Sequence, residues 1–150
     1  MTQPFQVHTR PARLEDVPGL ADLVTQLGYP TEPRAMEERV DRLLARPLVH
    51  RVVVAPGPMG GKLLGAVHAT RRETIESDDH VEISGLVVDA QARGTGVGKL
   101  LVASAERWAR DLGLRVIRVR SNVARAGAHQ FYQRLGFRVL KQQLAFIKEL

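Results

Sequence analysis

Three glycines at alternate positions, Gly94, Gly96 and Gly98, constrain this chain more than any other feature of its sequence. They follow the apolar segment 81–88 and precede a segment whose apolar residues recur at helical spacing. Because glycine has no Cβ, such a strand-to-helix turn exposes backbone N–H groups where the helix dipole favours an anion. The pattern predicts a phosphate-binding turn. The alternative is that the glycines only permit a tight turn.

Apolar periodicity and turn residues elsewhere predict the element order β-α-α-β-β-β-α-β-α-β. The predicted strands cover residues 5–10, 52–55, 63–70, 81–88, 115–120 and 138–150, and the predicted helices cover 16–28, 34–45, 97–112 and 124–135. Hairpins in the first half indicate antiparallel pairing, and the helical crossover before 115–120 indicates one parallel pair. We therefore expect an α/β (α+β) fold with a mixed, mostly antiparallel central sheet flanked by helices, in a single domain over residues 1–150.

Composition narrows the possible partners. The net charge of +6 suits a polyanion, but the arginines are scattered and only 5% of residues are aromatic, so a base-stacking platform and a nucleic-acid partner are not expected. No apolar run approaches the roughly 20 residues that span a bilayer, so no membrane association is expected. The absence of cysteine and of a signal-peptide pattern fits a cytoplasmic protein.

Two common phosphate-binding motifs do not fit the turn. The P-loop needs a glycine where this chain has Arg93 and a hydroxyl residue where it has Leu100, which disfavours nucleotide hydrolysis. The dinucleotide fingerprint needs its third glycine at Lys99. The turn also lies in mid-chain behind antiparallel strands, which is wrong for a doubly wound fold.

A third pattern does fit, Gln91-x-x-Gly94-x-Gly96. It follows Leu86-Val87-Val88-Asp89 and precedes the segment Asn122…Phe131-Tyr132-x-x-Leu135-Gly136-Phe137. With these flanking segments and the matching element order, the sequence resembles the GNAT family of N-acetyltransferases over nearly its whole length. The resemblance implies the acyl-CoA N-acyltransferase (GNAT) fold, acetyl-CoA as acyl donor and no metal. It implies transfer of acetyl to a primary amine of a small molecule, amino acid or peptide, by direct attack in a ternary complex.

The resemblance also implies a binding site for acetyl-CoA. The backbone of the glycine turn would hold the pyrophosphate, and the end of the preceding strand would bind the pantetheine arm by strand-like hydrogen bonds. The residues assigned to the cofactor are Leu86, Val87, Val88, Gln91, Arg93, Gly94, Thr95, Gly96, Val97, Gly98, Lys99, Asn122 and Tyr132. For Asn122, a helix-capping role is an alternative that does not exclude cofactor binding.

Acetylation of an amine requires a base for the amine and an acid for the leaving thiolate. By resemblance, Tyr132 is the acid; the alternative is a tyrosine packed beside Phe131. Glu82 is the candidate base, and it shares a strand face with Ser84, Leu86 and Val88 unless Gly85 introduces a bulge. The alternatives for the base are His80 or a water chain, and Glu82 is otherwise an exposed strand charge.

The acceptor site is expected to be built from the first two helices and the loop between them, with Tyr29, Glu32 and Ser84 as substrate residues. The acidic loop 71–79 offers attraction for a cationic amine, although charged loops are usually solvated surface. A non-catalytic acyl-CoA-binding sensor or interaction module of the same fold is the alternative function. A homodimer is expected, since dimers are the commonest oligomers.

Overall fold

The computed structural model describes residues 4–150; the predicted domain 1–150 begins with residues 1–3, which lie outside the described part. The chain divides into two compact units, the first ending at Val119 and the second running from Arg120 to Leu150. Each unit is described by itself below. The first holds the sheet and three helices, and the second holds one helix.

The sheet of the first unit has five strands in the order β1-β2-β3-β4-β5. The strands are β1 (Arg10–Pro11), β2 (His50–Pro56), β3 (Leu63–Arg72), β4 (His80–Val88) and β5 (Ile117–Val119). The first three pairs of neighbours are antiparallel, and β4 pairs with β5 in parallel. The helices are α1 (Val17–Gln26), α2 (Pro33–Leu44), α3 (Val97–Asp111) and, in the second unit, α4 (Ala126–Arg134). The predicted mixed, mostly antiparallel sheet flanked by helices is confirmed.

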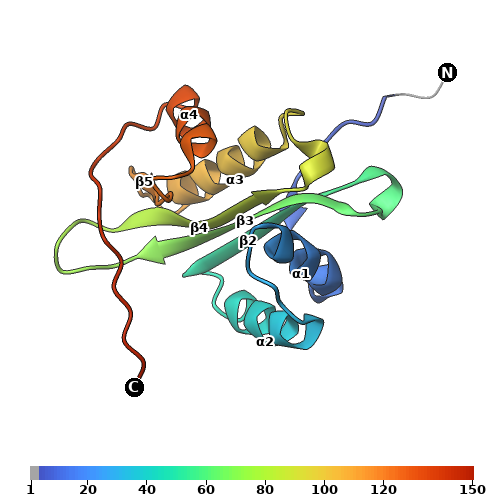
Figure 1. Ribbon diagram of the computed structural model, residues 1–150, viewed down its shortest axis with the longest axis horizontal. Coiled ribbons are helices and arrows are strands. Elements are labelled where there is room, and N and C mark those ends of the chain that lie inside the picture. Colours follow the sequence, from blue (N-terminus) through green and yellow to red (C-terminus); the bar gives the residue numbers. More distant parts are fainter. Residues whose placement is uncertain (1–3) are drawn as a thin grey trace. The chain divides into compact units, whose positions relative to one another are not determined.

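Helices cover both faces of this sheet (Figure 1). On one face, the apolar sides of α1 and α2 form a core cluster with sheet residues that include Val52, Val54 and Ala66. On the other face lies α3, whose Val97 and Leu101 are buried. Burial of these apolar stripes is the main favourable contribution to the stability of such a fold.

Gly65 allows α3 to approach the sheet closely. A Cβ at Gly65 would lie 2.9 Å from Cδ1 of Leu101, 3.0 Å from Cγ1 of Val97 and 2.8 Å from the carbonyl oxygen of Val87. Only glycine leaves room for these contacts. The same contacts identify the sheet face of Gly65 as the α3 face.

One predicted strand is wrong in extent and another is absent. The first strand was expected over 5–10, but strand pairing begins at Arg10, opposite Val54. The last was expected over 138–150, but this segment forms no strand in the structure, and its residues are exposed. Apolar residues favour a strand only where a partner strand pairs with them, so propensity alone overestimates strand length at chain ends.

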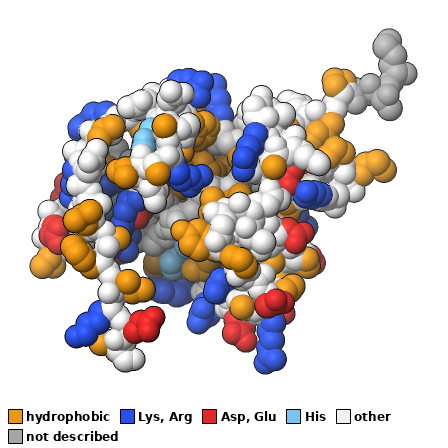
Figure 2. Space-filling view, in the orientation of Figure 1, with side chains coloured by type: hydrophobic (Ala, Val, Ile, Leu, Met, Phe, Trp, Pro, Cys, Tyr) orange, Lys and Arg blue, Asp and Glu red, His pale blue; other side chains and the backbone are white. Residues whose placement is uncertain are grey.

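Charged side chains on the surface are mixed in sign. Figure 2 shows Lys and Arg side chains spread over the face drawn there, with Asp and Glu among them. The formal charge of +6 is therefore not gathered into a single patch on the face that Figure 2 shows.

Within residues 4–150, no helix is long and apolar enough to cross a membrane.

Candidate active site

The glycine turn joins β4 to α3 as the sequence predicts. One turn of 3-10 helix, Ala90–Ala92, follows β4. Gly94 (φ 78°) and Gly96 (φ 88°) then adopt left-handed backbone conformations, and α3 begins directly after Gly96. Side chains rarely adopt this conformation, which explains both glycines. Among residues 4–150, and apart from the adjoining residues, no atom lies within 4 Å of the Cβ position at either glycine, so the space beside the helix N-terminus is open.

Asp89 anchors this turn, a role that the sequence analysis missed. Its carboxylate is 2% exposed and accepts hydrogen bonds from Lys62 Nζ (2.9 Å), Gln26 Nε2 (2.8 Å) and the backbone N–H of Gln91 (3.1 Å). The bond from Lys62, followed by that from Gln26, lowers the pKa of Asp89 to about 2. The turn is therefore tied to the hairpin β2–β3 and to the end of α1. An aspartate at a strand end before a glycine turn is the sequence signal for this role.

β5 pairs with only the first part of β4. The parallel register ends at Ile83 opposite Val119, whereas β4 continues to Val88. Alternate backbone groups between Ser84 and Val88 consequently face an edge that β5 does not occupy. This segment contains Leu86, Val87 and Val88, the strand residues that the sequence assigns to the pantetheine arm.

A bulge at Ser84 corrects the predicted face of Glu82. His68 of β3 lies opposite Gly85, while the next residue, Ala69, lies opposite Ile83, so Ser84 is an extra residue in β4. Glu82 consequently lies on the α1–α2 face, opposite Thr70. Leu86 and Val88, which were expected on the face of Glu82, lie opposite Val67 and Gly65 on the α3 face. An extra residue reverses the alternation of side chains beyond it.

The bulge lies beside a group of polar side chains on three strands that the sequence analysis did not identify. Thr70 Oγ1 lies 2.8 Å from Ser84 Oγ and 3.2 Å from His68 Nε2, and that nitrogen lies 3.1 Å from Nδ1 of His50. We call His50, His68, Thr70 and Ser84 the hydroxyl–imidazole chain. The strand register places His50, His68 and Thr70 on the sheet face that α1 and α2 cover. His68 and Thr70 at alternate positions of one strand were the available sequence signal.

Both imidazoles of the hydroxyl–imidazole chain have pKa values below the usual range for histidine. Burial, with a smaller effect of His50, lowers the pKa of His68 to about 4. Burial, with the positive charge of Arg46, also lowers the pKa of His50. The two rings are therefore neutral at pH 7, and each then has one ring nitrogen that accepts a hydrogen bond and one that donates.

The two base candidates from the sequence have different surroundings. His80 is 5% exposed, and its Nδ1 lies 3.1 Å from the carbonyl oxygen of Asp78, which gives it a structural contact. Glu82 has an ion pair with Arg72, with 3.5 Å between Oε2 and Nε. Glu82 lies beside Thr70 in the register, so it is the carboxylate adjacent to the hydroxyl–imidazole chain.

The second unit holds Asn122 and Tyr132. Asn122 Oδ1 accepts a hydrogen bond from the backbone N–H of Ala124 (2.9 Å), which closes a local turn before α4. The helix-capping alternative is not seen, because the N-cap of α4 is Arg125 and this helix has no side-chain cap hydrogen bond. His129 Nε2 donates to the carbonyl of Asn122 (2.8 Å). Tyr132 is half-buried and packs edge-on against Phe131 and Phe137, with ring centroids 5.2 and 5.6 Å away.

Burial favours the protonated form of Tyr132. It raises the pKa of the Tyr132 phenol above its usual range, and the charge of Arg125 offsets part of this effect. The phenol therefore retains its proton at neutral pH, as a general acid must.

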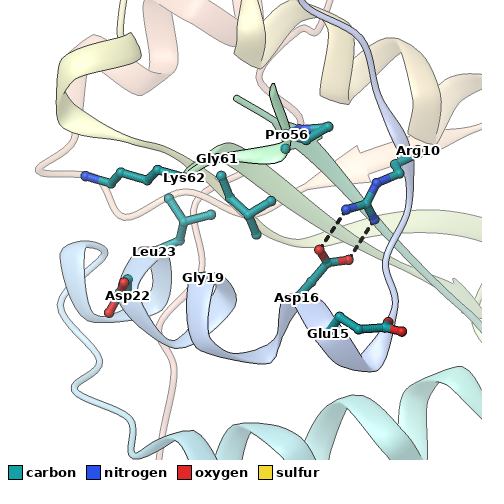
Figure 3. A pocket seen from close by; sticks show the side chains of 11 residues that line it. Arg10, Glu15, Asp16, Gly19, Asp22, Leu23, Pro56, Gly61 and Lys62 are labelled. Atoms are coloured by element: carbon teal, nitrogen blue, oxygen red, sulfur yellow. Dashed lines mark hydrogen bonds and ion pairs between the residues drawn. The ribbon is translucent and has the colours of Figure 1, made fainter. Parts of the chain in front are cut away.

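The predicted acceptor residues are only partly brought together. Tyr29 and Glu32 are exposed on the loop between α1 and α2, and Ser84 is exposed at the bulge of β4. A separate pocket of about 310 Å³ lies between α1 and the β2–β3 turn, and none of the predicted site residues lines it. In Figure 3, Arg10 faces Asp16 in that pocket through two hydrogen bonds of 2.8 Å. Because Arg10 and Asp16 bind each other, this pair leaves neither charge unpaired for a ligand in the pocket.

A mixed sheet that opens beside a glycine turn defines the acyl-CoA N-acyltransferase fold, and comparison with known proteins identifies the family. The model of the Acetyltransferase (GNAT) family matches residues 18–137, so the chain belongs to that family. The solved structure of AAC(6')-Iy with a bisubstrate analogue, CoA-S-monomethyl-acetylneamine, has a TM-score of 0.85 at 20% identity. That match covers 97% of this chain and 100% of the other.

Curated relatives are similar over part of their length. The uncharacterized N-acetyltransferase YhdJ of Bacillus subtilis is 38% identical over 72 residues, which is 47% of this chain and 51% of YhdJ. The aminoalkylphosphonate N-acetyltransferase of Salmonella typhimurium is 40% identical over 57 residues, which is 38% of this chain and 37% of that protein. The chain thus matches about half or less of the length of these relatives.

Proposed function

We propose that the protein is an acetyl-CoA-dependent N-acetyltransferase that moves acetyl to a primary amine by direct attack in a ternary complex. The observation that carries this proposal is the open glycine turn at the N-terminus of α3, beside the part of β4 that β5 does not pair. The match to the Acetyltransferase (GNAT) family model supports this proposal. Because that match spans residues 18–137, it also supports one functional domain.

The turn suits the pyrophosphate of coenzyme A. The first N–H groups of α3 have no partner within the helix, and the helix dipole favours negative charge there. The space at Gly94 and Gly96 is open, and side chains at both positions would enter it. Arg93 and Lys99 are exposed beside the turn and add positive charge. Bound coenzyme supplies the thioester whose carbonyl carbon the amine attacks.

The remaining cofactor assignments extend from the turn. Leu86, Val87 and Val88 offer backbone groups to the pantetheine arm, and Gln91, Thr95, Val97 and Gly98 belong to the turn itself. Asn122 keeps its assignment to the coenzyme, which rests on the family motif, together with its local hydrogen bond to Ala124.

The reaction needs a proton acceptor for the amine and a proton donor for the thiolate. A lysine-like amine at pH 7 is neutral only about once in 2,500 molecules, a cost of about 4.6 kcal/mol. The family motif assigns the donor to Tyr132, whose phenol is protonated at neutral pH because burial raises its pKa. Glu82, the base expected from the sequence, lies on the α1–α2 face, where its carboxylate attracts a cationic amine.

The acceptor is proposed to be a small amine that reaches the α1–α2 face. Tyr29 and Glu32 are exposed on the loop between those helices, and Ser84 is exposed at the bulge. The names of two similar proteins refer to an aminoalkylphosphonate and to the bisubstrate analogue CoA-S-monomethyl-acetylneamine. The sequence alternatives, an amino acid or a peptide amine, belong in the same test.

The test measures release of coenzyme A thiol while a panel of amines is supplied with acetyl-CoA. Because the chain has no cysteine, a thiol-reactive dye reports only the coenzyme. We expect release above the rate of acetyl-CoA hydrolysis with at least one primary amine, and acetylated amine in equal amount by mass spectrometry. Binding of acetyl-CoA without turnover on any amine contradicts the enzyme proposal and favours the acyl-CoA sensor. Light scattering of the same sample tests the expected homodimer.

A further inference from the structure

The hydroxyl–imidazole chain carries an inference about the proton acceptor, and it rests on the proposed function. We propose that the acceptor amine loses its proton through Ser84 and Thr70 to the imidazole of His68, rather than directly to Glu82. The route crosses from β4 to β3, and His50 of β2 partners its terminal imidazole.

The hydroxyl–imidazole chain is continuous from the exposed Ser84 to the two imidazoles. Ser84 is exposed at the bulge, 2.8 Å from the hydroxyl of Thr70, and Thr70 lies 3.2 Å from Nε2 of His68. Both distances are within the range of hydrogen bonds. A hydroxyl both donates and accepts, so each of the two can pass a proton on while receiving another. The bulge that displaces Ser84 from the normal strand alternation therefore places the exposed end of the route at the open part of β4.

The two imidazoles form a suitable terminus. Nδ1 of His50 lies 3.1 Å from Nε2 of His68 and 3.5 Å from Thr70 Oγ1, so the three atoms form a triangle. A proton that reaches His68 Nε2 is shared with the facing nitrogen of His50 as a charge-assisted hydrogen bond. Because burial keeps both rings neutral at rest, the pair holds the proton only briefly and returns it to solvent.

The charged groups around the pair set its electrostatics. From the turn between α2 and β2, Arg46 disfavours a second positive charge on His50. From β4, Glu82 lies opposite Thr70 in the register, and its carboxylate is paired with Arg72. In the proposed route His68, and not Glu82, receives the proton.

The step balances in atoms and charge. The amine first loses its ammonium proton to solvent, its neutral nitrogen then forms a bond to the thioester carbonyl carbon, and the carbon–sulfur bond breaks. Nitrogen is positively charged once its bond to carbon has formed, so a weak base is sufficient to remove its proton. That proton moves to Ser84 Oγ, the Ser84 proton moves to Thr70 Oγ1, and the Thr70 proton moves to His68 Nε2. The sulfur receives its proton from Tyr132, which is reprotonated from solvent.

The test compares two substitutions at Thr70 in the full chain, with acetyl-CoA and the best amine of the panel. Thr70→Val keeps the shape and removes the hydroxyl, and we expect kcat to fall roughly 100-fold with little change in KM for acetyl-CoA. Thr70→Ser returns a hydroxyl, and we expect it to recover most of the lost rate. His68→Gln is expected to lower kcat as much as Thr70→Val does. His8→Gln, at an exposed histidine outside the chain, is the control that retains wild-type kcat.

Two results overturn the inference, and they differ in what else they overturn. If Thr70→Val and Thr70→Ser both keep kcat within twofold of the wild type, the proton route is wrong while the enzyme proposal stands. If the wild type acetylates no amine, the proposed function fails, and the inference fails with it. Thermal unfolding of each variant shows whether it is folded, and the Thr70 pair decides the outcome if His68→Gln does not fold.

Discussion

Lys62 Nζ lies 2.9 Å from Oδ1 of Asp89, and this ion pair joins the hairpin β2–β3 to the residue that begins the glycine turn. The two residues are 27 positions apart in the sequence (89 minus 62). Gln26, at the end of α1, binds the same carboxylate and also accepts the backbone N–H of Ala90 (3.0 Å). The β2–β3 hairpin and α1 therefore fix the position at which the glycine turn leaves β4.

Replacement of Asp89 tests whether this network prepares the turn for coenzyme A. Asp89→Asn removes the charge that Lys62 binds, and the turn loses part of its support. We expect Kd for acetyl-CoA to rise roughly tenfold, the equivalent of one charged hydrogen bond. Isothermal titration calorimetry measures it, with Asp22→Asn on the exposed side of α1 as the matched control. An unchanged Kd in Asp89→Asn means that the network supports folding only.

The glycines of the turn are tested by a pair with the same backbone strain. Gly96 (φ 88°) and Gly113 (φ 76°) both adopt left-handed conformations, one before α3 and one after it. Alanine at either position is expected to destabilise the fold by about 1–2 kcal/mol. Only Gly96→Ala also places a methyl group in the open space of the turn, so only this variant is expected to lose acetyl-CoA affinity. Equal losses of affinity in both variants argue against the turn as the binding site.

The buried imidazole of His68 predicts a pH dependence of stability. Its pKa is about 4 in the folded chain against 6.5 ordinarily, so the unfolded chain binds the proton more tightly. The contribution of neutral His68 to the free energy of unfolding is fully present above pH 6.5. It falls by at most about 3 kcal/mol as the pH decreases to about 4. Urea unfolding from pH 7 to pH 4 measures this slope. We expect His68→Gln to flatten it and His8→Gln to leave it unchanged; parallel slopes in all three proteins refute the burial effect.

Tyr132→Phe tests the assigned general acid. The ring contacts with Phe131 and Phe137 remain, whereas the phenolic proton is lost. We expect kcat to fall roughly 100-fold or more with unchanged Kd for acetyl-CoA. Steady-state thiol release and calorimetry measure the two quantities. If kcat is retained, Tyr132 has the packing role alone.

The sequence predicted what neighbouring residues determine together. The turn at Gly94 and Gly96 depends on local backbone freedom and on the helix that follows, so its conformation was predictable. The core faces of α1, α2 and α3 follow from helical spacing in the same way. The class of fold followed from the order of these elements.

The parts that the sequence did not predict depend on pairing between distant strands. The bulge at Ser84 arises from the register of β4 against β3, and it moved Leu86 and Val88 to the other face. The hydroxyl–imidazole chain joins residues from β2, β3 and β4, which periodicity within one strand cannot bring together. The first strand was predicted too long and the last predicted strand is absent for the same reason, since a strand requires a partner.

The most direct test of the central claim, that the glycine turn holds coenzyme A, is a calorimetric titration of the wild-type chain with acetyl-CoA, coenzyme A, ATP and NAD. We predict that acetyl-CoA and coenzyme A bind while ATP and NAD do not. At one hundred times Kd, acetyl-CoA should stabilise the fold by about 2.7 kcal/mol. A folded sample that binds neither acetyl-CoA nor coenzyme A contradicts the assignment of the turn, and with it the acetyl-transfer reaction.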